Sequence, residues 1–151
     1  MNTAGREVVP MFMGEYEHSI DNKGRVIIPA KFREQLGDTF VLTKGLDGCL
    51  FIYTNEDWAA FAEKLKNTSF GSEKSRKLQR YFMAGAVQVE ADKQGRILIP
   101  GKLRDLAGLT KDVSLLGVGN RIELWNTETW ENDGGYDDAN EIAEILEGLW
   151  D

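Results

Sequence analysis

The chain has 151 residues, of which 42% are hydrophobic and 28% are charged, a composition typical of a single globular domain. No stretch approaches the roughly 18 uninterrupted apolar residues of a membrane span, and the N-terminus lacks the apolar segment of a signal peptide. The single cysteine, Cys49, excludes an internal disulfide and most cysteine metal sites, which favours a reducing cytoplasm. Residues 1–10 show no periodicity and are predicted to be a disordered extension or an expression remnant.

The formal net charge of −7 is distributed unevenly along the chain. Residues 131–151 contain eight of the 25 acidic residues and no Lys or Arg, which leaves 17 acids and 18 bases in residues 1–130. Binding to a polyanion depends on where the charges lie more than on their sum. The acidic tail therefore does not exclude a nucleic-acid partner for the rest of the chain.

The first half of the chain predicts short strands, turns and one short helix. A strand over 14–20 leads into the turn 21–24, where Asp and Gly are favoured turn residues. The β-branched run that follows stops at Pro29, and residues 30–37 predict one or two helical turns between that proline and Gly37. Residues 39–45 and 49–53 predict a strand pair.

Two helices are predicted after this first unit, and a third at the C-terminus. Thr54 and Asp57 resemble a capping box that opens a helix through about Lys66. A second helix covers 73–83, and its basic residues predict either a solvated face or a flank that contacts DNA. The third helix, 137–149, carries an apolar stripe at i, i+3, i+4 and i+7 (Ile142, Ile145, Leu146, Leu149). We expect this stripe to pack against its own body or a neighbouring subunit; binding a separate partner is the alternative.

The second half of the chain repeats the first. "DNKGRVIIPAKFR" at 21–33 and "DKQGRILIPGKLR" at 92–104 are identical at seven of thirteen positions, and the similarity extends over 13–58 and 84–130. About 45 residues are too few to bury an adequate core alone. The two copies are therefore predicted to interleave their strands into one pseudo-twofold barrel of a β-rich α+β class. The predicted divisions of the chain are 1–10, repeat 1 at 11–58, a helical connector at 59–83, repeat 2 at 84–130, and an acidic C-terminal helix at 131–151.

The repeated motif places basic side chains at equivalent positions in both copies. Repeated Lys and Arg at fixed spacing suit a phosphate backbone, and Arg can also bind guanine edges. The alternative is that Asp21–Arg25 and Asp92–Arg96 only hold their hairpins together; both roles can coexist, with Asp orienting Arg. The predicted DNA-binding residues are Arg25, Lys23, Arg96, Lys93, Lys31, Arg33, Lys102 and Arg104, and the residues predicted to orient them are Asp21, Gly24, Asp92 and Gly95.

Catalysis has little support in the sequence. There is one histidine, His18, predicted to be a surface or edge residue, and Cys49 is predicted to be a small buried hydrophobe. No Gly-rich phosphate loop and no nucleophile–base pair is evident. The sequence therefore predicts a protein without enzymatic activity, metal or cofactor. Turnover of a generic ester or phosphate that depends on His18 would favour a hydrolase instead.

The two Asp-x-x-x-Arg motifs, each followed by a short apolar run and Pro, resemble the MraZ family, together with the flanking "GLDGCLFIY" and "NRIELW" segments. The resemblance covers roughly residues 11–131. It implies two AbrB/SpoVT-like swapped-hairpin units in a transcriptional regulator that binds double-stranded DNA at short direct repeats. It also implies that the DNA target is the promoter of the division and cell-wall gene cluster, which includes the protein's own gene. The family further implies ring-shaped homo-oligomers, often octamers, that associate with the nucleoid. The alternative is a protein-interaction scaffold that uses the acidic helix.

Overall fold

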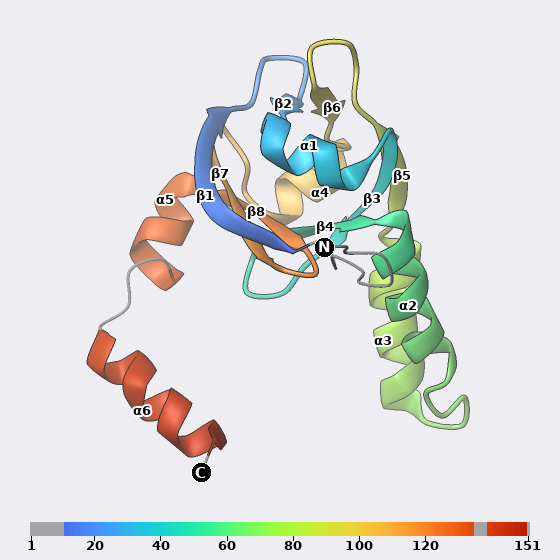
Figure 1. Cartoon of the computed structure of the whole chain (residues 1–151). Helices are drawn as coiled ribbons and strands as arrows, with labels where there is room; N and C mark the ends of the chain where they lie inside the picture. Colours follow the sequence, from blue (N-terminus) through green and yellow to red (C-terminus); the bar gives the residue numbers. More distant parts are fainter. Residues whose placement is uncertain (1–10, 135–138, 151) are drawn as a thin grey trace, which may run out of the picture.

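The computed structural model describes residues 11–134 and 139–150 of the chain. Its fold is α+β, as predicted. A body built around β-sheets carries helices that project from it (Figure 1). The predicted extension 1–10 lies outside the described residues, as do residues 137 and 138 of the predicted third helix.

Each repeat forms the same series of elements, and the predicted strands and helices are confirmed with small shifts of their ends. Repeat 1 consists of β1 (Phe12–Ser19), β2 (Arg25–Ile27), α1 (Ala30–Leu36), β3 (Thr39–Lys44) and β4 (Leu50–Thr54). Repeat 2 consists of β5 (Val87–Glu90), β6 (Arg96–Leu98), α4 (Gly101–Leu106), β7 (Asp112–Gly119) and β8 (Ile122–Asn126). The connector holds α2 (Asn55–Lys66) and α3 (Glu73–Ala84); α5 (Thr127–Thr129), the π-helical η1 (Trp130–Gly134) and α6 (Ala139–Trp150) follow repeat 2.

The strands of the two repeats interleave. Six of them form one sheet in the order β1-β7-β8-β4-β3-β5, and β2 and β6 form a separate antiparallel ribbon. The edge strand of each repeat therefore pairs with the other repeat: β1 with β7, and β5 with β3. Exchanging every strand for its counterpart reverses the order and leaves it unchanged, which is a pseudo-twofold relation. The sheet is open, with β1 and β5 at its two edges, so the predicted closed barrel is not seen.

Both repeats contribute to the main hydrophobic core. Ile28 and Ile99 are fully buried counterparts, and Phe32 of α1 and Leu103 of α4 are another buried pair. Phe12, at the start of β1, meets Phe32 edge to face with 5.7 Å between the ring centroids. Because the core is assembled from both halves, neither repeat has an apolar interior of its own.

The connector helices cover a second, aromatic cluster. α2 begins where Thr54 Oγ1 accepts a hydrogen bond from the Asp57 backbone N–H at 2.9 Å, which confirms the predicted cap. Phe61 of α2 and Phe82 of α3 pack edge to face, and Phe82 stacks on Phe51 of β4. Two hydrogen bonds fix α3 to the first repeat: Thr43 Oγ1 donates to the Phe82 carbonyl, and Tyr81 donates to the Gly45 carbonyl.

The C-terminal helix α6 has no buried residue. Its apolar side chains Ile142, Ile145, Leu146 and Leu149 are exposed by 44% to 75%. The packing against its own body, which the sequence analysis gave as one expectation, is therefore not found within the described residues.

Candidate nucleic-acid interface

The two motif turns lie side by side at one end of the body, above the β2–β6 ribbon (Figure 1). In the antiparallel register of the ribbon, Arg25 is opposite Leu98 and Arg96 is opposite Ile27. Side chains alternate between the faces of a strand. Val26 and Ile97 accordingly enter the core, while the opposite face presents Arg25, Arg96, Ile27 and Leu98. One outward face therefore carries an arginine from each repeat.

An aspartate orients each of these arginines. Arg25 Nε donates to Asp21 Oδ2 at 2.8 Å, and the second repeat has the same 2.8 Å bond from Arg96 to Asp92. The arginine side chains are 28% and 27% exposed. Within residues 11–134 and 139–150, the hydrogen bonds of these two arginine side chains are made by Nε alone. The structure therefore contains the Asp–Arg bond of the hairpin interpretation, and binding of DNA by the partly exposed arginines stays a prediction.

The aspartates also build the turns themselves. Asp21 Oδ1 accepts hydrogen bonds from the backbone N–H groups of Lys23 and Arg25, both at 2.9 Å. Asp92 Oδ1 accepts the equivalent pair from Gln94 and Arg96. These bonds, above all the one from the arginine's own N–H, lower the pKa of each aspartate below its ordinary value, and the Arg side chain lowers it further.

Each turn is braced by the other repeat. The Ile28 N–H donates to the Gly95 carbonyl at 2.8 Å, and the Ile99 N–H donates to the Gly24 carbonyl at 2.9 Å. Gly24 and Gly95 both have positive φ, 83° and 81° respectively, a backbone conformation that favours glycine. These crossed hydrogen bonds hold the two turns together, so the arginines beside them cannot separate without breaking contacts between the repeats.

Arg33 and Arg104 pack beneath the turns. A Cβ at Gly95 would lie 2.7 Å from Arg33 Cζ, and one at Gly24 would lie 2.8 Å from an Nη atom of Arg104. Arg33 Nε donates to the Ile28 carbonyl at 2.9 Å, whereas Arg104 Nε is buried without a hydrogen-bond partner in the described part of the chain. These two predicted DNA-binding residues are only partly exposed and support the turn of the opposite repeat; DNA contact by them stays a prediction.

The four predicted lysines are exposed. Lys23 and Lys93 are in the two turns, and Lys31 and Lys102 are in the first turns of α1 and α4. The structure therefore brings together the turn residues of both repeats and the arginines of both short helices, and leaves the lysines exposed to solvent. No contact in the structure tests their role in binding.

Ile27 and Leu98 are residues of this surface that the sequence analysis missed. They are 40% and 58% exposed, and they lie between the two arginines on the ribbon. Sequence reasoning grouped them with their buried neighbours as an apolar run. The signal that could have found them is the period-two alternation counted from each arginine.

Acid should weaken the two turns, because the aspartates are stabilised in their charged form. A carboxyl with a lowered folded-state pKa contributes stability above its unfolded value of 3.8, and this contribution is lost as the pH falls through the folded pKa. We expect the Asp21→Asn, Asp92→Asn double variant to lose less stability than the wild type between about pH 4 and 2. Urea unfolding at several pH values measures this. Asp38→Asn is the control, and a wild-type-like acid profile in the double variant would contradict the assignment.

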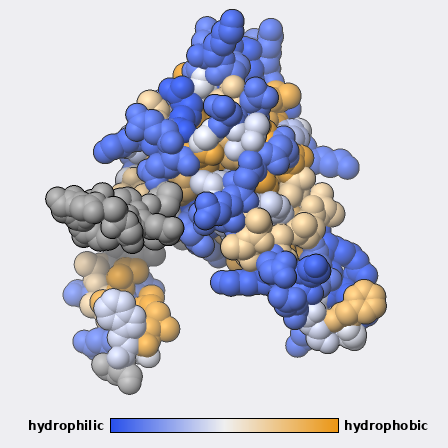
Figure 2. Space-filling view, turned by 45° about the vertical axis from the view of Figure 1, so that its right-hand side comes forward, coloured by the Kyte–Doolittle hydropathy of each residue, from blue (hydrophilic) through white to orange (hydrophobic). Residues whose placement is uncertain are grey.

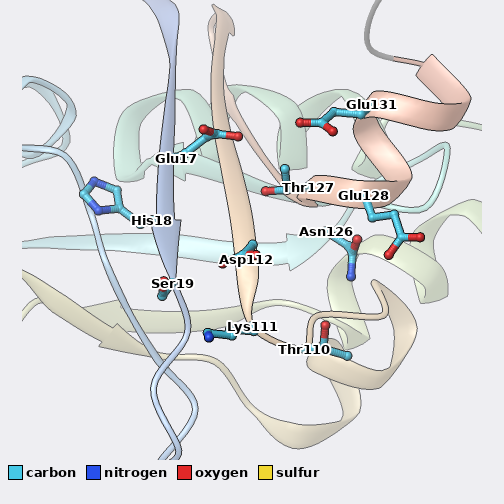
Figure 3. A pocket seen from close by; sticks show the side chains of 10 residues that line it. All are labelled: Glu17, His18, Ser19, Thr110, Lys111, Asp112, Asn126, Thr127, Glu128 and Glu131. Carbon is cyan, nitrogen blue, oxygen red and sulfur yellow. The ribbon is translucent and has the colours of Figure 1, made fainter.

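A polar pocket of about 550 Å³ lies elsewhere, at the end of β1 and the start of β7 (Figure 3). His18 lines it together with Glu17, Lys111, Asp112, Glu128 and Glu131. His18 is partly exposed on the edge strand, in agreement with the prediction. The described residues include no group of three or more His, Cys, Asp or Glu side chains that could hold a metal ion. The pocket therefore presents acidic and polar groups without a recognisable catalytic arrangement.

Cys49 is buried, as predicted, and its Sγ donates to the Leu46 carbonyl at 3.2 Å. Burial raises the pKa of this thiol to about 12, with the nearby Glu123 carboxylate adding to the effect. The thiolate is the nucleophilic form of cysteine, so Cys49 is a structural side chain and not a reactive one at neutral pH. In addition, none of the described helices has the length and apolar character needed to cross a membrane.

The fold and this surface define a duplicated α+β protein that presents two Asp-oriented arginines at one end. The model of the MraZ protein family matches residues 11–81 and again residues 82–143. A "Transcriptional regulator MraZ" from Lachnoclostridium phytofermentans is 60% identical over 136 residues, which is 90% of this chain and 95% of that protein. Proteins of the same name from Caldanaerobacter subterraneus subsp. tengcongensis (55% identical, covering 92% of this chain and 99% of that one) and Acetivibrio thermocellus (54%, covering 90% and 94%) are similar as well. The chain belongs to the MraZ family, as its motifs predicted.

Proposed function

We propose that this chain is a sequence-specific DNA-binding transcriptional regulator without enzymatic activity. The observation that carries the proposal is the pair of Asp-oriented arginines on one face, one from each repeat. The relatives at 50–60% identity are named transcriptional regulators, which supports a regulator and gives no support to catalysis. The described chain therefore combines the residues and the family expected of a DNA-binding protein.

The β2–β6 ribbon and its turns are proposed as the DNA-reading element. The major groove of B-DNA admits a two-stranded β-ribbon, and an arginine can bind the O6 and N7 atoms of guanine with two hydrogen bonds. Arg25 and Arg96 would supply these contacts, because aspartate holds their Nε atoms while the side chains remain partly exposed on the outer face of the ribbon. The lysines Lys23, Lys93, Lys31 and Lys102 would contact phosphates, and Ile27 and Leu98 could contact thymine methyl groups.

The proposed target is a promoter with short direct repeats, upstream of the division and cell-wall gene cluster that includes the chain's own gene. The protein would act in the cytoplasm, associated with the nucleoid, as a ring-shaped homo-oligomer, with an octamer of paired swapped-hairpin units as the proposed form. A ring would explain how a nearly neutral body binds DNA. Each subunit makes only a few contacts, but several subunits bind the tandem repeats at once, which raises the overall affinity.

A protein-interaction scaffold is the second candidate function. The observation that favours it is the uncovered apolar row on the acidic helix α6. Such a scaffold would purify with a stoichiometric protein partner and would not retard DNA. Retardation of promoter DNA by the purified chain alone would exclude it as the main function.

A footprint on the DNA upstream of the chain's own operon tests the proposed function. We expect protection at regularly spaced short repeats, and none on a shuffled sequence of the same composition. Release of counterions predicts that binding weakens with salt by a log–log slope of about −0.9 per phosphate contact. Four basic residues in contact would give a slope of about −3.6 per bound subunit. No protection, or binding insensitive to salt, would contradict the proposal.

A further inference from the structure

An apolar groove lies between the two connector helices. Its volume is about 480 Å³, and its lining includes Leu65 and Lys66 of α2, Phe70 of the loop, and Met83 of α3. Phe70 is 82% exposed and Met83 45% exposed, whereas Leu65 at the base is buried. Gln79 ties the two helices together by donating to the Leu65 carbonyl and to Thr68. The groove is therefore a preformed apolar surface, and the aromatic ring of Phe70 at its edge is exposed to solvent.

The surroundings of the groove are basic. Lys64 and Lys66 are in the last turn of α2, and α3 adds Lys74, Arg76, Lys77 and Arg80. Two acids lie between residues 63 and 84: Glu63, which lines the groove together with Lys66, and Glu73, which pairs with Lys77 at 3.7 Å. Lys66 and Arg80 are exposed. The groove would therefore attract an apolar segment that carries negative charge.

Helix α6 has the complementary properties. Its apolar row is uncovered, with Leu149 75% and Trp150 80% exposed, and its charged residues are the three glutamates Glu141, Glu144 and Glu147. A helix of 12 residues is marginal in water unless its apolar face is packed. It is as long as α2 and α3, which also have 12 residues each. The helix therefore needs an apolar partner surface with basic surroundings, and the groove between α2 and α3 has both properties.

The two surfaces do not meet within one chain. Figure 1 shows α6 and the α2–α3 hairpin projecting from opposite sides of the body, and Figure 2 shows hydrophobic residues on both projections. We propose that α6 of one copy docks in the α2–α3 groove of a second copy, so that successive copies associate head to tail. A contact between two different surfaces of identical subunits generates a ring when the rotation closes.

This inference rests on the self-association in the proposed function and is independent of DNA binding. Its test uses the full chain without DNA, in sedimentation velocity over a range of concentrations. Leu149→Asp places a charge on the apolar face of α6, and Met83→Asp places one in the groove. We expect each variant to weaken self-association at least tenfold. Gly148→Asp adds the same charge to α6 where no atom lies within 4 Å of an added Cβ, on the face of the glutamates, and should assemble like the wild type.

Mixing the two variants makes the test specific. Leu149→Asp retains a normal groove and Met83→Asp retains a normal α6, so an equimolar mixture has one intact interface and should form heterodimers. Circular dichroism checks that both variants are folded. Assembly of both variants at wild-type strength, or a mixture without heterodimers, would overturn the proposed interface while leaving a ring possible. A wild type that stays monomeric at 0.1 mM, a concentration of the order used for weak complexes, would overturn the interface and the proposed ring together.

Discussion

Replacing Arg25 by alanine is expected to weaken promoter binding by roughly 10- to 100-fold per bound subunit, because a two-bond arginine–guanine contact contributes about 1–3 kcal/mol. Arg25 is the residue that we expect to be most sensitive. On tandem repeats the loss multiplies over the subunits, so binding should fall below detection. An electrophoretic mobility shift with the upstream DNA measures the effect.

The variant should still fold, and the structure gives the reason. Asp21 Oδ1 accepts hydrogen bonds from the backbone N–H groups of residues 23 and 25, and these bonds do not need the arginine side chain. The crossed bond from Ile99 to the Gly24 carbonyl is also a backbone bond. A loss of DNA binding in Arg25→Ala with unchanged circular dichroism and assembly would therefore report on the interface and not on stability.

Three matched variants sharpen this experiment. Lys111→Ala removes one exposed positive charge outside both motifs and outside the α2–α3 groove, and should bind DNA like the wild type. Arg25→Lys retains the charge without the planar guanidinium, so it should keep the salt dependence and lose sequence discrimination. Arg96→Ala measures the share of the second repeat. A shift by Arg25→Ala at unchanged affinity would refute the assignment of this turn to DNA binding.

Replacing Gly117 by alanine should destabilise the fold by about 3 kcal/mol or more, because the added methyl group would enter the neighbouring strand. A Cβ at this position would lie 2.6 Å from both Met13 Cα and the Phe12 carbonyl carbon, which are backbone atoms of β1. Moving this end of β1 would withdraw Phe12, which is 1% exposed, from its contact with Phe32. Loss of a buried phenylalanine alone costs about 3–5 kcal/mol.

Urea unfolding at a fixed protein concentration, followed by tryptophan fluorescence, measures this destabilisation. Gly148→Ala is the control, because a Cβ there meets no atom within 4 Å and the residue is in the helix α6. That variant should unfold at the wild-type urea concentration. If the free energy of unfolding of Gly117→Ala also lay within about 0.5 kcal/mol of the wild-type value, the close approach of β1 and β7 would be wrong.

Local sequence signals predicted most of the elements and the layout of the motif. The Asp and Gly of each turn, the short β-branched run and the proline correspond to a turn, to β2 or β6, and to the start of α1 or α4. The bond between Asp21 and Arg25 was one of the two interpretations of that spacing, and the structure contains it in a partly exposed side chain. These features depend on neighbours within about ten residues, so one sequence suffices to predict them.

Contacts between the repeats could not be predicted in the same way. Arg33 and Arg104 carry the same charge and lie on the same short helices as the exposed Lys31 and Lys102, yet each packs beneath the glycine of the opposite turn. Likewise, Gly45 and Gly117 occupy matching positions in the two copies, but an added Cβ would meet the Cys49 carbonyl in one case and β1 in the other. Arg33 and Gly95 are 62 residues apart, and Arg104 and Gly24 are 80 apart, so these pairs meet only through tertiary packing, which local patterns do not encode.

The exchange of edge strands between the halves, β1 to β7 and β5 to β3, has a consequence for the history of the chain. After a gene duplication, two self-contained units could diverge freely, and one could even be lost. Here every ladder at the sheet edges joins a residue of one ancestral copy to a residue of the other. A substitution in an edge strand of one repeat therefore alters its pairing with the other repeat. The two repeats must consequently evolve together.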